Sequence, residues 1–413
     1  MKLPKALPVA WFQDFKAHAP KHSPGRVDVS GIAETIQRAL AAAGLNTQSG
    51  PMKGVTDTIH QALTAAGLTQ RSVPPSEHGV TINGTSREVD APYSDIDGTH
   101  PEPAPRVDAP LRGTFLHRSF ANSAGTRNYM LYVPASYATE SSEPVPAIVM
   151  LHGCTQSPHD FAAGTRMNAL ADQHGFLVIY PAQDANANGS RCWNWFRPED
   201  QIRDSGEPSL IAGITREVAS AYRIDARRIF VAGMSAGASM AVILGAMYPE
   251  LYVAVGAHSG LPYGAAHDMP SAFSAMQGGA ALPGQFQPLA ATPSSRAEGL
   301  NRIPTIVFHG DNDRTVNARN GDAIVEQVTV VGSDHQPLRA KVQTGTAPGG
   351  RKYRRTDYLD HANQTVVEHW MVHGAGHAWS GGSPNGSFTD PTGPDASTEM
   401  IRFFLSQRRA GTS

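Results

Sequence analysis

Short runs of apolar residues recur along most of the chain, and stretches with helical periodicity separate them. Residues 147–151, 176–180 and 305–308 are apolar at nearly every position. A run without a polar face is typical of a strand that is buried on both sides of a parallel sheet. Helical patterns occur between these runs, at residues 163–174 and 210–222. The alternation predicts an α/β fold in which helices flank a mostly parallel central sheet.

The same pattern predicts further strands and a final helix. Strands are expected at residues 128–133, 229–232, 251–257 and 366–372. Asp395 has the residue type of a helix N-cap, and apolar positions recur with helical spacing after it. In sheets of this class, functional groups collect at the carboxyl ends of the strands.

Residues 1–70 differ, because a short helical segment is repeated within them. Residues 31–45 match residues 54–68, and the two copies end at Gly44 and Gly67. Glycine at this position is typical of a helix C-terminus, and each copy gathers its apolar side chains on one face. Two such helices cannot bury their faces alone. We therefore predict a helical N-terminal extension that either packs on the main domain or anchors the protein to an apolar surface, such as a polymer granule, or to a partner.

Residues 71–105 predict a linker, since prolines recur there among acidic and polar residues. The boundary near residue 105 leaves residues 106–409 as the main domain.

Charge and hydropathy exclude several classes of partner. The net charge of −2 and the pI of about 6.8 give no electrostatic basis for binding nucleic acid. No apolar run reaches the length of a membrane span. The basic N-terminus is followed by a short apolar stretch that Pro4 and Pro8 interrupt, without an Ala-x-Ala site. This pattern predicts no signal peptide and favours a cytoplasmic location, with an extracellular one as the alternative.

One motif stands at the end of a predicted strand and the start of a helix. Residues 233–237 read Gly-x-Ser-x-Gly, with Ser235 at the centre. In this context the motif predicts a nucleophile elbow, a sharp turn that exposes the serine hydroxyl. The helix that begins at Ala236 would direct its free N–H groups at an oxyanion. The alternative is a glycine-rich turn whose serine has no catalytic role.

A serine nucleophile needs a histidine to accept its proton and a carboxylate to orient that histidine. Two later predicted strands end in loops with these residue types, first Asp311 and Asp313, then His373 and His377. The order Ser, Asp, His is that of α/β-hydrolases. We favour His377 because it lies in a glycine-flanked loop beyond its strand. Asp313 is narrowly preferred because it lies further from the strand end than Asp311.

A second oxyanion donor is expected in the loop at residues 152–156, which follows the strand at 147–151. We predict that the backbone N–H groups of Cys154 and Ala236 form the oxyanion hole. One such donor stabilises a transition state by about 2.7–4 kcal/mol.

Together these motifs resemble the esterase family of poly(3-hydroxybutyrate) depolymerases, which also includes feruloyl and acetylxylan esterases. The segments that carry the resemblance are LHGCTQ at 151–156, RCWNWF at 191–196, GMSAG at 233–237, HGDND at 309–313 and GHAWSGG at 376–382. The resemblance covers about residues 112–406. It implies an α/β-hydrolase fold and hydrolysis of a hydroxyalkanoate polyester or its oligomers through an acyl-enzyme. It also implies that Asp313 is the acid of the triad, and the mechanism requires no cofactor or metal.

The only two cysteines, Cys154 and Cys192, fall in two of these motifs. The resemblance favours a disulfide between them. The alternative is a pair of buried free thiols, as a reducing cytoplasm would favour.

Aromatic residues lie beside the site motifs, namely Trp193, Trp195 and Trp379. Aromatic faces suit an apolar polyester chain, so we predict substrate binding, with core packing as the alternative. Residues 261–300 have few charges and are expected either to cover the site as a lid or to form a helical excursion.

Three other functions are alternatives to the predicted depolymerase activity. A feruloyl or acetylxylan esterase would use the same triad with a different pocket. A metal-dependent hydrolase would use side chains from the two late loops, namely His309, Asp311, Asp313, His373 and His377. A non-catalytic granule-associated protein would need only the N-terminal helices. Because the chain ends soon after the last predicted helix, without a separate module for crystalline polymer, amorphous polymer, oligomers or granules are the expected substrates.

Overall fold

The computed structural model describes residues 111–137, 143–279, 303–330 and 338–409. The chain divides into two units, Met1–Pro101 and Glu102–Ser413, and the described residues belong to the second. The predicted N-terminal helices and the predicted linker therefore lie outside the described residues, as do positions 280–300 of the predicted lid.

Ten of the described strands form one sheet. They are β1 (Thr114–Asn122), β2 (Gly125–Val133), β3 (Val145–Leu151), β4 (Leu177–Pro181), β5 (Ile224–Met234), β6 (Ala254–His258), β7 (Thr305–Gly310), β8 (Arg339–Thr346), β9 (Lys352–Leu359) and β10 (Thr365–Val372). Their order is β1-β2-β4-β3-β5-β6-β7-β10-β9-β8. The central strands from β4 to β10 in that order pair in parallel, and the flanking strands pair antiparallel. The predicted mostly parallel sheet is confirmed for its centre.

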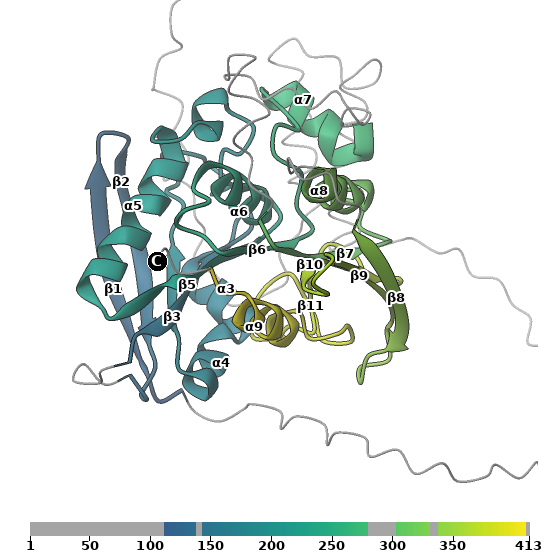
Figure 1. Cartoon of the computed structure of the whole chain (residues 1–413). Coiled ribbons are helices and arrows are strands. Elements are labelled where there is room, and N and C mark those ends of the chain that lie inside the picture. Colours follow the sequence, from purple (N-terminus) through teal and green to yellow (C-terminus); the bar gives the residue numbers. More distant parts are fainter. Residues whose placement is uncertain (1–110, 138–142, 280–302, 331–337, 410–413) are drawn as a thin grey trace, which may run out of the picture. The chain divides into compact units, whose positions relative to one another are not determined.

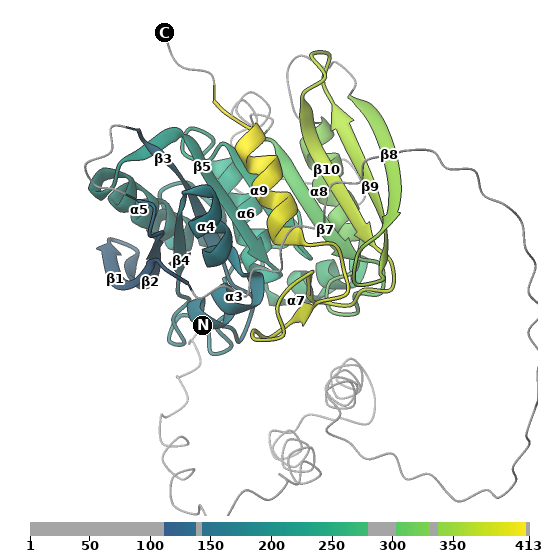
Figure 2. The ribbon, with the colours of Figure 1, turned by 90° about the horizontal axis from the view of Figure 1, so that it is seen from below.

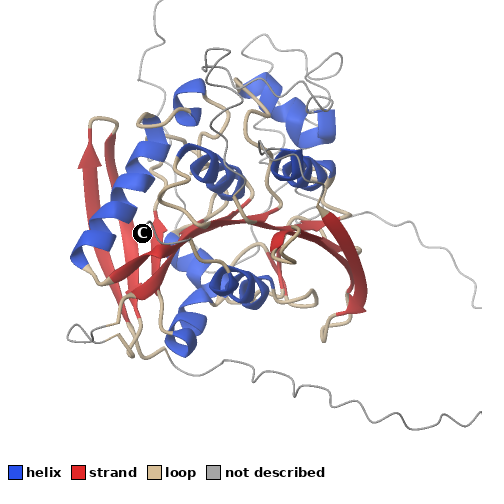
Figure 3. Ribbon diagram, viewed as in Figure 1, coloured by secondary structure: helices blue, strands red, loops and turns tan. Residues whose placement is uncertain are grey.

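Helices cover both faces of this sheet. They are α3 (Pro158–Thr165), α4 (Met167–His174), α5 (Gly206–Ala221), α6 (Ala236–Met247), α7 (Met269–Ser274), α8 (Arg319–Val330) and α9 (Ala396–Ser406), with short turns η3 (Pro198–Gln201) and η4 (Ala275–Gly279). Helices α5, α6 and α8 lie on one face, and α3, α4 and α9 on the other (Figures 1 and 3). Figure 2 shows α9 lying over the middle of the sheet. None of the described helices is both long and apolar enough to cross a membrane.

The apolar runs form strands because both of their faces are buried. In β3, Val149 and Leu151 pack into the core under α5, α6 and α8, whereas Ile148 and Met150 pack into the core under α3, α4 and α9. This is the environment that a fully apolar strand predicts. The predicted final helix is also confirmed, with the Asp395 side chain accepting the Thr398 N–H at its start.

One predicted helix is divided. The stretch at residues 163–174 contains the end of α3 and all of α4, and Arg166 between them has a φ of 55°. Its side chain donates hydrogen bonds to the Gly381 carbonyl and to Asp395. These contacts with distant residues fix the break, which a helical period cannot show.

The parallel strands end at one edge of the sheet. Leu151 pairs with Gly233, Met234 with His258, and Gly310 with Val372. The loops that follow β3, β5, β6, β7 and β10 therefore emerge together. A short parallel pair, β11 (Trp379–Ser380) and β12 (Thr389–Asp390), follows the last of these loops.

Candidate active site

Ser235 occupies the turn between β5 and α6. Its backbone dihedral angles are φ 57° and ψ −124°, in a region that residues other than glycine rarely enter. The turn is tight, since a β-carbon on Gly237 would lie 2.1 Å from the Leu151 carbonyl oxygen and one on Gly233 would lie 2.4 Å from Gly237. The strand-to-helix turn predicted at residues 233–237 is present, and its backbone strain lies at the serine.

Asp313 and His377, in the loops after β7 and β10, form a hydrogen-bonded pair. The Nδ1 atom of His377 lies 2.7 Å from Oδ2 of Asp313. Oδ1 accepts the backbone N–H groups of Thr315 and Val316, each at 2.9 Å. The Asp313 side chain is fully buried and the His377 side chain is 13% exposed, so the imidazole is the accessible member of the pair.

These contacts fix the charge of Asp313. Burial alone would raise the pKa of this carboxyl, but interactions with His309 and His377 outweigh it and hold the pKa well below its usual value. The ionised carboxylate accepts a hydrogen bond from the Nδ1–H group of His377, so that Nε2 of the imidazole carries the free lone pair. That is the form that a general base requires.

His258, at the end of β6, links the turn that carries Ser235 to the segment that follows His377. Among the described residues no hydrogen bond joins Ser235 to His377 directly. The carbonyl of His258 accepts the Ser235 N–H at 2.9 Å, and its Nε2 accepts the N–H of Ser380, close after His377, at 3.0 Å. Burial lowers the pKa of His258 to about 3, so the ring is neutral and can accept this bond. Sequence analysis missed His258, because nothing in its local pattern marks it.

The second-ranked candidates form a pair of their own. His373 Nδ1 lies 2.8 Å from Asp311 Oδ2, and the Gly374 N–H donates to Oδ1 at 2.7 Å. The His373 and Asp311 side chains are 47% and 40% exposed. The same two loops thus carry two His–Asp pairs, and of these the Asp313–His377 pair is the one shielded from solvent.

His309 supports the turn that holds Asp313. Its Nε2 atom lies 2.8 Å from the Val316 carbonyl oxygen and 3.6 Å from Oδ2 of Asp313. Its Nδ1 atom is buried without a hydrogen-bond partner among the described residues. The His309 ring therefore holds the end of the turn at Val316, and it is the second imidazole, besides His377, that lies next to the Asp313 carboxylate.

The loop at residues 152–156 lies against the serine. A β-carbon on Gly153 would lie 3.6 Å from the β-carbon of Ser235. The Gly153 N–H donates to Oε1 of Gln156 at 2.9 Å and is therefore occupied. Within the described part of the chain, no hydrogen bond is donated by the N–H of Cys154 or of Ala236. Both predicted oxyanion donors are thus available to a ligand oxygen.

A disulfide bond joins Cys154 to Cys192. The pairing implied by the family resemblance is confirmed, and the alternative of two free thiols is wrong. The bridge fastens the loop beside Ser235 to the segment that follows β4.

Comparison with known proteins identifies the family of the chain. The family model described as Esterase PHB depolymerase matches residues 127–336, just over half of the chain. The chain belongs to this esterase family.

Two relatives and one solved structure illustrate the range of similar proteins. Poly(3-hydroxyalkanoate) depolymerase C of Paucimonas lemoignei is 32% identical over 263 residues, which are 63% of this chain and 60% of that one. Feruloyl esterase B of Neurospora crassa is 36% identical over 145 residues, which are 35% of this chain and 47% of that one. Each match thus spans less than two thirds of the relative. The structure of an acetyl xylan esterase from Aspergillus awamori has a TM-score of 0.53 at 20% identity and covers 71% of this chain and 100% of that chain, which supports the fold.

In this esterase-family chain, the tryptophans predicted to bind substrate are buried. Trp193 and Trp379 are 0% and 1% exposed, and their indole N–H groups donate to the His152 carbonyl and to Ser397 Oγ. Trp195 is 6% exposed. The side chains of Trp193 and Trp379 pack in the core. Substrate contact stays a prediction for the three tryptophans.

The residues of the metal-site alternative fall into two groups, with His309 beside Asp313 in one of them. Asp311 binds His373, Asp313 binds His377, and His309 contacts a backbone carbonyl. Among the described residues, no group of three or more His, Cys, Asp or Glu side chains is arranged to hold a metal ion. The arrangement supports a serine–histidine–carboxylate site.

Proposed function

We propose that this chain is a serine esterase that hydrolyses ester bonds of poly(3-hydroxybutyrate), or of related short-chain polyhydroxyalkanoates and their oligomers. The observation that carries the proposal is the buried Asp313–His377 pair at the same sheet edge as Ser235 in its strained turn. Family membership and the similarity to a poly(3-hydroxyalkanoate) depolymerase support the substrate class.

In the proposed mechanism, Nε2 of His377 accepts the Ser235 proton as the serine oxygen attacks the ester carbonyl. The N–H groups of Cys154 and Ala236 stabilise the resulting oxyanion. His377 then protonates the leaving alkoxide, which departs as the hydroxyl end of a shorter chain and leaves an acyl-enzyme. Water, deprotonated by His377, releases the acid and restores the serine. Asp313 stays ionised throughout, in accordance with its low pKa.

The first experiment measures hydroxybutyrate release from amorphous poly(3-hydroxybutyrate) granules, with Ser235→Ala as the control. Release that the variant abolishes supports the proposal. A feruloylated sugar ester and acetylated xylan are assayed in parallel, because a feruloyl esterase shares 36% identity with part of the chain. Hydrolysis of the carbohydrate esters alone would keep the triad but replace the substrate class, and no hydrolysis of any ester would favour a non-catalytic granule-associated protein.

We also propose that the helices predicted in residues 1–70, which lie outside the described residues, anchor the enzyme to the polymer surface. Deletion of residues 1–105 should reduce adsorption to granules and leave turnover of a soluble oligomer unchanged. Equal adsorption of the full and shortened chains would contradict the anchor.

The Cys154–Cys192 bridge bears on the compartment. Structural disulfides persist mainly in oxidising compartments, so we propose the extracellular location over the cytoplasmic one that the N-terminus predicts. Alkylation of protein from acid-quenched cultures tests this, since two reactive thiols would support the cytoplasm.

A further inference from the structure

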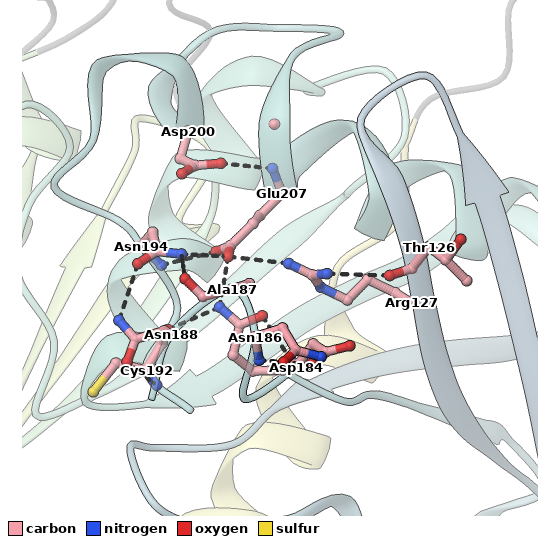
Figure 4. A network of polar contacts seen from close by, with 12 residues as sticks. Thr126, Arg127, Asp184, Asn186, Ala187, Asn188, Cys192, Asn194, Asp200 and Glu207 are labelled. Carbon is pink, nitrogen blue, oxygen red and sulfur yellow. Dashed lines mark hydrogen bonds and ion pairs between the residues drawn. The ribbon is translucent and has the colours of Figure 1, made fainter. Parts of the chain in front are cut away.

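A buried carboxylate outside the proposed triad organises a polar network beside the site. Glu207, in the first turn of α5, is 4% exposed. It accepts hydrogen bonds from Asn194 N (2.8 Å), Asn194 Nδ2 (2.7 Å), Gln183 Nε2 (2.5 Å) and Arg127 Nη2 (3.3 Å). Figure 4 shows the Glu207 carboxylate facing Asn194 from one side and Arg127 from the other. The proposed chemistry assigns no role to this group.

The network fixes the segment at residues 183–194, which follows β4. Gln183 Nε2 donates both to Glu207 and to the Cys192 carbonyl, the latter at 2.8 Å. Asn188 Nδ2 donates to Oδ1 of Asn194 at 3.0 Å. Both ends of the segment and the residue that bears the disulfide sulfur are thus tied to one carboxylate.

The same segment holds the loop that carries the proposed oxyanion donor. The Cys192 sulfur is bonded to that of Cys154. The Trp193 indole N–H donates to the His152 carbonyl at 3.1 Å, and the Gln183 N–H donates to Nε2 of His152 at 3.1 Å. The Thr155 N–H donates to the carbonyl of Ser190 at 2.7 Å. The Cys154 N–H therefore lies between residues that are each attached to the segment at 183–194.

An ionised carboxylate suits this position better than an amide. All the groups that face the two oxygens of Glu207 are donors, and Arg127 supplies a positive charge 3.3 Å away. Charge-assisted bonds to a carboxylate are stronger than bonds between neutral groups. An amide would turn one acceptor into a donor, so that buried donors would face each other without an acceptor.

We propose that Glu207 is a positioning residue for the oxyanion hole. It orders the segment at 183–194 and, through the Cys154–Cys192 bridge, holds the Cys154 N–H where the oxyanion forms. This inference rests on the proposed esterase function, and the design below separates the two.

The test compares Glu207→Gln with Glu217→Gln on p-nitrophenyl acetate. Glu217 is a matched control because it lies on the same helix, is exposed and accepts a hydrogen bond from the Tyr129 hydroxyl, outside the Glu207 network. We expect Glu207→Gln to lower kcat on the order of tenfold, with KM changed less than about twofold, as for a loss confined to the transition state. Glu217→Gln should retain wild-type kcat.

Two readouts distinguish positioning from a merely structural role. A trifluoromethyl ketone forms a tetrahedral adduct whose oxyanion occupies the same place, so its inhibition constant should rise by the factor by which kcat/KM falls. In a Cys154→Ser/Cys192→Ser background, Glu207→Gln should lower kcat less than about threefold, because coupled groups are not additive.

Several outcomes would overturn the proposal. One is a kcat of Glu207→Gln equal to that of Glu217→Gln, and another is an unchanged inhibition constant. A third is an equal loss of kcat with and without the disulfide bridge. A fourth is a loss of kcat that disappears when active serines are titrated, because it then reflects fewer folded molecules. If Glu207→Gln does not fold, Gln183→Met removes the donor between Glu207 and Cys192, and the same results are expected. Wild-type protein without Ser235-dependent hydrolysis would instead refute the proposed function.

Discussion

Asp200 provides a quantitative test of the electrostatics beside the site. Its side chain is buried, with 3% of the residue exposed, and its Oδ1 atom accepts the Glu207 N–H at 2.7 Å. Burial raises the pKa of Asp200 to about 7, and the charges of Glu207 and Glu199 add to the rise, whereas Arg197 opposes it. Because its pKa is raised, the Asp200 carboxyl keeps its proton below about pH 7 in the folded chain.

The sign of the effect follows from proton counting. The unfolded carboxyl loses its proton near pH 4, whereas the folded one keeps it to about pH 7. Between these values the folded state binds more protons, so this group makes the free energy of unfolding fall as pH rises. A difference of about three pKa units at about 1.36 kcal/mol each gives at most about 4 kcal/mol, complete above pH 7.

Asp200→Asn removes this titration and keeps the acceptor for the Glu207 N–H. We therefore expect the stability of the variant relative to wild type to improve as pH rises from 4 to 8, by up to about 4 kcal/mol. Denaturant unfolding at each pH, followed by tryptophan fluorescence, measures this difference. The comparison with wild type is needed because three buried histidines make the free energy of unfolding rise with pH in both proteins. They are His152, His258 and His369, whose pKa values burial lowers to about 4, 3 and 4.

Asp204→Asn is the matched control, since the Asp204 side chain is 69% exposed and lies in the same connection. The pH dependence of its stability relative to wild type is the baseline against which that of Asp200→Asn is compared. A constant difference between Asp200→Asn and wild type would refute the reasoning and place the proton elsewhere.

Two further substitutions test the site directly. Asp313→Asn should lower kcat by about 10⁴-fold with little change in KM, because the amide would favour the wrong tautomer of His377, and a steady-state assay that finds a loss below tenfold would contradict this role. Gly237→Ala should cost more than about 3 kcal/mol of stability or misplace the serine, since its β-carbon would meet the Leu151 carbonyl at 2.1 Å. Gly189→Ala, whose β-carbon meets nothing within 4 Å, is the control for thermal unfolding.

The centre of the fold could be predicted because its strands have no polar face. The runs at 147–151, 176–180 and 305–308 correspond to β3, β4 and β7. Strands β8 and β9 were not predicted from the sequence. Residues of β8 are almost all exposed, so its pattern lacks an apolar run, and pairing with β9 rather than burial defines it.

The triad candidates could be ranked from the sequence because their chemistry, order and strand ends coincide. Their supporting residues could not, since these act through contacts with distant parts of the chain. His258 contacts Ser235 through its carbonyl and Ser380 through its ring. The same reason applies to Trp193. The sequence alone cannot show whether its indole contacts a substrate or the carbonyl of His152, which is its hydrogen-bond partner in the structure.

The two halves of the proposed site are supported by different means. His258 is a neutral ring held in the core, and it relates the serine turn to the histidine loop through two backbone N–H groups. The oxyanion side depends on a charged group, Glu207, and on a covalent bond between Cys154 and Cys192. A change that perturbs the Glu207 network or the bridge should therefore affect stabilisation of the oxyanion while leaving the Asp313–His377 pair intact. We therefore expect mutation to separate proton transfer from oxyanion stabilisation in the proposed site.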